Sequence, residues 1–186
     1  MTQATITRYT SMAIGLHWLT AALIIAAFGL GWTLADMEFS PQKLRWLSWH
    51  KWLGITLLGL TGLRLGWRLT HPAPLLPATV PVWRQWAAHA VHLLLYGLLF
   101  AIPLSGWLFS SAKGIPVVYL GVLPLPDLIS ANETAAGGLR TLHAVLNYAL
   151  LAAVGAHIGA ALKHHFIERD TVLARMLPIV RRRGNN

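Results

Sequence analysis

Long apolar runs alternate with short polar connections along the whole chain. The apolar runs cover about residues 12–34, 49–69, 86–110 and 139–165. Each is long enough to cross a bilayer as a helix, since about 20 apolar residues suffice. The pattern predicts an all-α fold, an integral membrane four-helix bundle. Residues 1–176 would form one transmembrane domain, and residues 177–186 a basic C-terminal tail.

The connections between these runs differ in composition. We expect a short polar connection at 35–48 and an irregular, proline-rich one at 71–83, because proline interrupts regular helix. Pro103 is expected to kink the third helix, which membrane helices tolerate. The longest connection, 111–138, predicts a docking surface or a lid, since long loops in compact proteins are usually functional.

Composition excludes several classes of protein. Only 11% of the 186 residues are charged and 55% are hydrophobic, whereas soluble domains carry about 25% charged residues. The formal charge of +9 lies in the gaps between the apolar runs, so it does not indicate nucleic-acid binding. The chain has no cysteine, which excludes an iron–sulfur cluster and covalently attached haem.

The basic residues also predict an orientation. With four spans, ten Lys and Arg residues lie on the side of the two termini and five on the other side. Because cytoplasmic segments are enriched in Lys and Arg, both termini should be cytoplasmic. The first apolar run is too long for a signal peptide, so we expect it to be retained.

The last apolar run holds His143 and His157, which are 14 positions apart. On a helix this is about 21 Å at ~1.5 Å per residue, with both side chains on nearly the same face. The two imidazoles would therefore lie near opposite rims of a hydrocarbon core about 30 Å thick. Histidines at such depth are functional candidates, and this spacing indicates two ligand positions rather than one catalytic centre.

The other helices supply a partner for each histidine. By depth, His17 belongs with His157 near the cytoplasmic rim, and His50 with His143 at the opposite rim. Two pairs on opposite sides of the membrane predict two non-covalent haems, with histidine on both faces of each iron. Buried polar contacts or a proton path are the alternatives, but neither predicts pairing at both depths.

Further candidates surround these pairs. Two interpretations remain open for the glycines beside the histidines: close approach of a flat ligand, or tight helix packing. These glycines are Gly15, Gly54, Gly155 and Gly159. His92 is a candidate contact to a haem propionate or a quinone, or else forms an interhelical hydrogen bond.

Basic side chains are candidate partners of the propionates. Arg64 and Arg68 would serve the cytoplasmic side, and Lys51, Arg45 and Arg140 the other side. Extension of these side chains to lipid phosphates is an equally good explanation for any one of them.

Several motifs resemble one known family. They are RYTSMAIGLHWL, SWHKWLGI, HLLLYGLLFAIPLSGWLFSSAKGIPV and the ending ALKHHFIERDTVLARM. Over residues 8–176 the chain resembles the prokaryotic cytochrome b561 family, four-helix di-haem proteins of the bacterial inner (plasma) membrane. The resemblance implies haem b ligands at His17, His50, His143 and His157. It also implies one-electron transfer with the quinone pool and, for some members, oxidation of periplasmic superoxide by ubiquinone.

Two functions follow from this resemblance. The first is a self-contained oxidoreductase that passes electrons from a periplasmic donor to quinone. The second is a haem-b anchor subunit that relays electrons between quinone and a separate dehydrogenase. A transporter or purely structural protein would require the four histidines to be coincidental. Steering of anionic superoxide is local at best, because Asp36, Glu38, Asp127 and Glu133 reduce the net charge of the outer side to +1.

Overall fold

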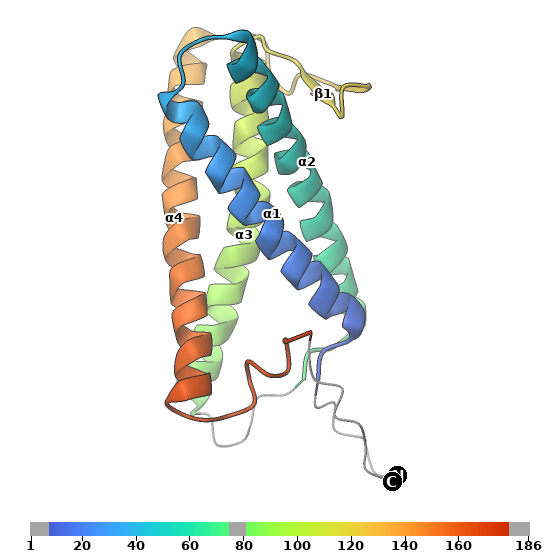
Figure 1. Ribbon diagram of the computed structural model, residues 1–186, viewed down its shortest axis with the longest axis vertical. Helices are drawn as coiled ribbons and strands as arrows, with labels where there is room; N and C mark the ends of the chain where they lie inside the picture. The colour runs from blue at the N-terminus through green and yellow to red at the C-terminus, as the bar shows by residue number, and fades with distance from the viewer. Residues whose placement is uncertain (1–7, 75–80, 179–186) are drawn as a thin grey trace.

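Four long helices and one small hairpin make up the computed structural model, which describes residues 8–74 and 81–178. The elements are α1 (Ser11–Asp36), α2 (Pro41–Thr70), α3 (Val82–Ala112), β1 (Val117–Tyr119), β2 (Leu123–Leu125) and α4 (Glu133–Phe166). Successive helices run in opposite directions (Figure 1). α1 begins and α4 ends at one end of the molecule, called here the terminal end. The hairpin lies toward the other, the hairpin end.

Polar caps determine where three of the helices begin. The side chains of Thr10, Ser40 and Asn132 accept hydrogen bonds from backbone N–H groups in the first turns of α1, α2 and α4. Ser40 is followed by Pro41, a residue favoured at the first helical position. The predicted polar connection at 35–48 is therefore wrong over most of its length, because α2 begins at Pro41. A search for apolar runs misses this capped, polar first turn.

Three of the described helices are long and apolar enough to cross a membrane: α1, α3 and α4. α2 has the length but does not meet the same hydropathy criterion. Its five basic residues are Lys43, Arg45, Lys51, Arg64 and Arg68. Hydropathy thus supports three spans directly, and a fourth span in α2 stays a prediction.

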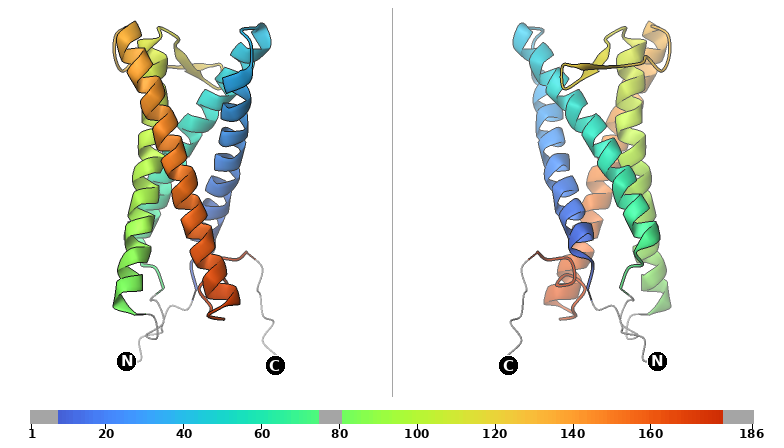
Figure 2. Two further views of the ribbon diagram at one scale, coloured as in Figure 1. Left: turned by 90° about the vertical axis from the view of Figure 1, so that its left-hand side faces the viewer. Right: turned by 90° about the vertical axis from the view of Figure 1, so that its right-hand side faces the viewer.

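The helices pack as a chain of neighbours. α1 packs along α2, α2 along α3, and α3 along α4. Leu98 and Leu99 of α3 form the core cluster with Leu150 and Ala153 of α4. Within the described residues, the backbones of α1 and α2 do not come close to that of α4. α4 therefore contacts the bundle mainly through α3 (Figure 2).

The protein is mostly helical, as expected, and the β1–β2 hairpin is an addition that was not predicted. The strands are antiparallel and pair Val117 with Leu125. Leu120 and Gly121 at the turn have φ angles of 53° and 76°, as in the tight turns that match the twist of hairpins. The indole N–H of Trp52 donates to the carbonyl of Val118 at 2.7 Å, so the hairpin is held against α2.

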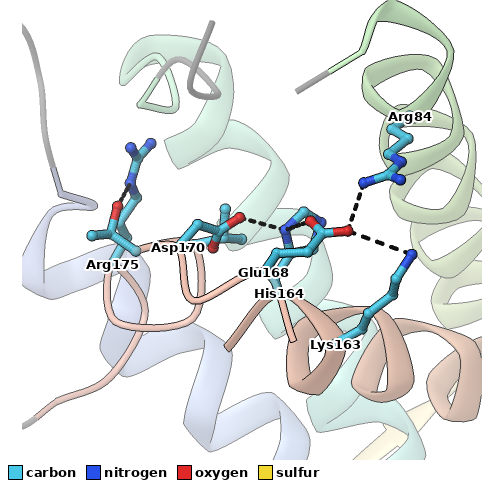
Figure 3. A network of polar contacts seen from close by, with 8 residues as sticks. Arg84, Lys163, His164, Glu168, Asp170 and Arg175 are labelled. Atoms are coloured by element: carbon cyan, nitrogen blue, oxygen red, sulfur yellow. Dashed lines mark hydrogen bonds and ion pairs between the residues drawn. The ribbon is translucent and has the colours of Figure 1, made fainter. Parts of the chain in front are cut away.

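The segment after α4 turns back across the terminal end. Glu168 contacts Arg84 of α3 at 2.5 Å and Lys163 at 3.4 Å, and His164 contacts Asp170 at 2.5 Å (Figure 3). Farther on, the indole N–H of Trp18 in α1 donates to the carbonyl of Met176 at 2.8 Å. These contacts join α3, α4 and α1 below the bundle. The predicted basic tail lies outside the described residues from 179 onward.

We expect Glu168→Gln to lower the free energy of unfolding by about 1 kcal/mol, since it removes the carboxylate shared by two cations. The measurement is thermal unfolding in detergent, with limited proteolysis after α4. Glu133→Gln is the matched control, because Glu133 pairs with Lys113 while 80% exposed. Equal effects of the two substitutions would show that the network at Glu168 does not hold this segment.

Candidate metal-binding histidine pairs

Four histidines from three helices form two pairs at different levels of the bundle. The rings of His17 in α1 and His157 in α4 have centroids 6.2 Å apart, with an interplanar angle of 63°. Those of His50 in α2 and His143 in α4 are 6.4 Å apart, at 84°. The first pair, called here the inner pair, lies toward the terminal end, and the second, the outer pair, toward the hairpin end. The structure thus places next to each other the same histidines that were predicted to pair from their depth in the membrane.

The ring separations suit one metal ion between two imidazoles. A metal–nitrogen bond is about 2 Å and a ring nitrogen lies about 1 Å from the centroid, so opposed ligands have centroids about 6 Å apart. Rings stacked directly on each other would be closer. Both pairs have nearly this separation. The ligand role itself stays a prediction.

The helices that carry each pair are held apart. His17 and His157 join α1 to α4, and His50 and His143 join α2 to α4, and neither helix pair has a close backbone approach in the described chain. The closely packed helix pairs are α1 with α2, α2 with α3, and α3 with α4. The histidines therefore bridge helices whose backbones stay apart, where a large flat ligand is more easily accommodated than between packed helices.

Two glycines let the outer histidines pack against a neighbouring helix. A Cβ added at Gly106 of α3 would lie 3.1 Å from Cε1 of His143, and one at Gly31 of α1 would lie 3.2 Å from Cε1 of His50. Contacts this short force a neighbour to move. α1 and α3 thus position the rings that α2 and α4 carry.

Hydrogen bonds determine the tautomer of His143. Nδ1 lies 3.0 Å from Oγ of Ser105 and 3.1 Å from the carbonyl of Ile102, and Ser105 Oγ lies 2.8 Å from that same carbonyl. One assignment places a proton in every contact: the hydroxyl of Ser105 donates to Ile102, and Nδ1–H of His143 donates to both oxygens. Nε2 then carries the lone pair that a metal requires.

A cation lies beside the inner pair. A guanidinium nitrogen of Arg64 is 2.9 Å from Nδ1 of His17, and the guanidinium lies 5.5 Å from the centre of the Tyr96 ring. Arginine can only donate, so Nδ1 of His17 accepts here. Were Nε2 to bind a metal, Nδ1 would take up the proton and Arg64 would turn to another acceptor.

Of the other residues predicted to contact a haem or quinone, His92 lies next to a histidine pair, whereas Lys51 contacts backbone carbonyls. His92 lies 5.2 Å from the ring of His157, and its Nδ1 is 2.7 Å from the carbonyl of Ala88. The ammonium of Lys51 donates to the carbonyls of Ile115 and Pro116, which lie just before β1.

The other three arginines predicted as propionate partners form no ion pair among the described residues. Arg45 and Arg140 are exposed, and Arg68 is half-buried near the end of α2. None of the ion pairs within the described ranges includes them.

Ser105, Gly31 and Gly106 were missed by sequence reasoning. The glycines singled out instead, Gly15, Gly54, Gly155 and Gly159, have open space where a Cβ would lie. This open space argues against tight helix packing at the four positions, and close approach of a flat ligand there stays a prediction. The tight contacts to the histidines come from glycines of other helices. The one available signal was the small Ser105–Gly106 pair within an otherwise bulky apolar run.

Comparisons with known proteins agree with the resemblance. The family model described as "Prokaryotic cytochrome b561" matches residues 8–178. "Cytochrome b561 homolog 2" of Escherichia coli (strain K12) is 36% identical over 172 residues, 91% of each chain. "Probable superoxide oxidase CybB" of Yersinia pestis is 30% identical over 92% of this chain and 96% of its own.

Gly106→Ala is expected to lower the free energy of unfolding by about 1–3 kcal/mol, the usual cost of overpacking. The added Cβ would lie 3.1 Å from His143, whereas one at Gly97 on the same helix would meet nothing within 4 Å. Gly97→Ala is therefore the matched control, and thermal unfolding in detergent compares the two. Equal stability of both variants would mean that His143 does not pack against Gly106.

Proposed function

The chain belongs to the prokaryotic cytochrome b561 family and is a membrane electron-transfer protein, and we propose that it holds two haems b, one on each histidine pair. The observation that carries the proposal is the separation of 6.2 and 6.4 Å between paired rings at two levels of one bundle. Each haem, when bound, supplies an iron that takes up and releases one electron at a time. Two histidines would hold each haem, which suits transfer of electrons rather than binding of a substrate to the iron.

We propose four spans, with α2 as the fourth and both termini cytoplasmic. The basic residues of α2 lie toward its two ends, and the stretch from Trp52 to Leu63 between them carries no charge. The side with the termini holds twice as many Lys and Arg residues as the other, as in cytoplasmic segments. Residues 1–176 would then be one transmembrane domain of a multi-pass inner-membrane protein, with the inner pair near the cytoplasm.

We propose that the haem propionates bind the basic side chains nearest each histidine pair. Arg64 lies within hydrogen-bonding distance of His17 and can turn to a carboxylate, and Arg68 is one helical turn away on α2. On the outer side Lys51 follows His50 directly. Arg45 and Arg140 are exposed and are weaker candidates.

His92 fits a quinone site better than a propionate site. Its Nδ1–H donates to Ala88, so in the neutral ring Nε2 is an acceptor. An acceptor suits the O–H of a quinol and repels a carboxylate. We therefore propose that ubiquinone exchanges electrons near the inner pair, beside His92.

A self-contained oxidoreductase is the function that we favour. Electrons would enter at the outer pair from a periplasmic donor and leave to ubiquinone at the inner pair. The printed name of the Yersinia pestis relative suggests superoxide as that donor. Two superoxide anions would each lose one electron to become O₂, and one quinone would take up both electrons with two protons. The alternative is an anchor subunit that relays electrons between quinone and a separate redox protein, for which the connection from α3 to α4, which holds the hairpin, offers a docking surface.

His143→Ala should halve the haem content, from two per chain to one, because it removes a ligand of the outer pair only. The measurement is the haem-to-protein ratio of detergent-purified protein, with optical spectra of the remaining haem. His89→Ala is the control, since His89 is exposed and its Nδ1 lies 2.7 Å from the carbonyl of Gln85 on its own helix. Loss of both haems, or of neither, would contradict the proposed pairing.

A stopped-flow experiment separates the two functions. In a self-contained oxidoreductase, a superoxide pulse reduces the haems of the purified protein and added ubiquinone then reoxidises them. A relay subunit instead ignores superoxide yet equilibrates with quinol. Haem that responds to neither reagent would contradict both.

A further inference from the structure

We propose that the two sites have different reduction potentials, lower at the outer pair and higher at the inner pair, and that Ser105 is the positioning residue that lowers the outer one. The inference rests on the proposed two-haem function and adds a direction to it. Electrons would pass favourably from the hairpin end to the terminal end. Each pair offers two imidazoles as ligands, so any difference between the two sites comes from what surrounds the rings.

Neutral oxygens surround the outer ligand His143. Its Nδ1–H donates to Ser105 and Ile102, and the hydroxyl of Ser105 donates to Ile102 in turn. Ser105 is 3% exposed, so water does not compete for these bonds. Hydrogen bonds in such a chain strengthen one another in a medium of low dielectric constant.

These bonds affect the iron through the ring. A ligand histidine that donates its second N–H becomes more basic and gives more electron density to the metal. More electron density favours the oxidised iron, which carries the additional positive charge. The outer site is thereby expected to have the lower reduction potential.

The inner pair has a cation beside it instead. The guanidinium of Arg64 is 2.9 Å from His17, and whichever acceptor it turns to, its charge stays on the same side chain of α2. A positive charge at this distance disfavours the oxidised iron and raises the reduction potential, strongly so away from water.

No carboxylate side chain of the described segments offsets this charge, and haem propionates would be present at both proposed sites alike. In the ion pairs that the described segments form, Glu168 is engaged with Arg84, Lys163 and His164, and Glu133 with Lys113. Neither Arg64 nor Arg68 takes part in them.

The outer pair also has a basic neighbour, Lys51. Its ammonium donates to two carbonyls just before β1, at 3.2 Å to Ile115 and 3.3 Å to Pro116. Among the described hydrogen bonds, none joins Lys51 to either outer histidine. The charge of Lys51 is thus partly balanced by carbonyl dipoles, whereas the guanidinium of Arg64 is next to a ring of the inner pair. The asymmetry between the two sites remains.

The test is a potentiometric titration of the detergent-purified holoprotein, followed by the optical bands of the two haems. Two one-electron steps are expected in the unmodified protein. Ser105→Ala should raise the lower potential and leave the higher one unchanged. The expected shift is a threefold to tenfold change in the one-electron equilibrium constant, tenfold being about 59 mV. Ser105→Cys, with a weaker acceptor in nearly the same volume, should give an intermediate shift.

Two further variants complete the design. Arg64→Gln should lower only the higher potential, and Arg64→Lys, which keeps the charge, should restore it. Ser110→Ala is the control: Ser110 is a buried serine of α3 whose hydroxyl donates to the carbonyl of Ile115 and contacts no histidine. It should move neither potential.

The failures of the two proposals are distinguishable. Fewer than two haems in the unmodified protein would overturn the proposed function. Two haems with equal potentials, or a shift of the higher potential in Ser105→Ala, would overturn this inference alone. If Ser105→Ala does not retain the outer haem, the Ser105→Cys and Arg64 variants decide the outcome. No shift in either would overturn the inference.

Discussion

The separation of α4 from α1 and α2 is the constraint on which the rest of the structure depends. α4 supplies one histidine to each pair. In both pairs the other histidine comes from a helix, α1 or α2, whose backbone makes no close approach to α4 in the described chain. α3 makes this possible, because it packs along both α4 and α2 and holds them in one bundle. In lipid each helix satisfies its own backbone, so the bundle needs no continuous contact between every pair of helices.

Close approach elsewhere compensates for this separation. At the outer pair, Gly31 and Gly106 allow α1 and α3 to contact the rings that α2 and α4 carry, so all four helices meet there. At the terminal end, the segment after α4 joins α3 through Arg84 and Glu168 and joins α1 through Trp18 and Met176. The loosely packed side of the bundle is thus closed by the side chains of the pairs and by this segment.

Sequence reasoning could predict what depends on depth along a helix. The pairing of His17 with His157 and of His50 with His143 needed only helical rise and alternating direction, and the rings lie next to each other as those rules require. The start of α2 at Pro41 and the hairpin were not predicted, because caps and tight turns are local features that hydropathy does not detect. Ser105 and Gly106 were missed because rotation of α3 about its axis, which no sequence period determined, decides what faces His143.

If both pairs hold haem as proposed, ligand identity alone describes each redox centre poorly. Both pairs consist of one histidine of α4 and one from α1 or α2, so the proposed ligands are of the same kind at both ends. The differences come from the helices that supply no ligand to the site in question. α3 places neutral oxygens on His143 at the outer pair, and α2 places a guanidinium on His17 at the inner pair. Two proposed sites with the same kind of ligand can therefore still differ in reduction potential. The outer site borders α3 and the inner site borders α2, and neither helix carries a histidine of the site that it borders.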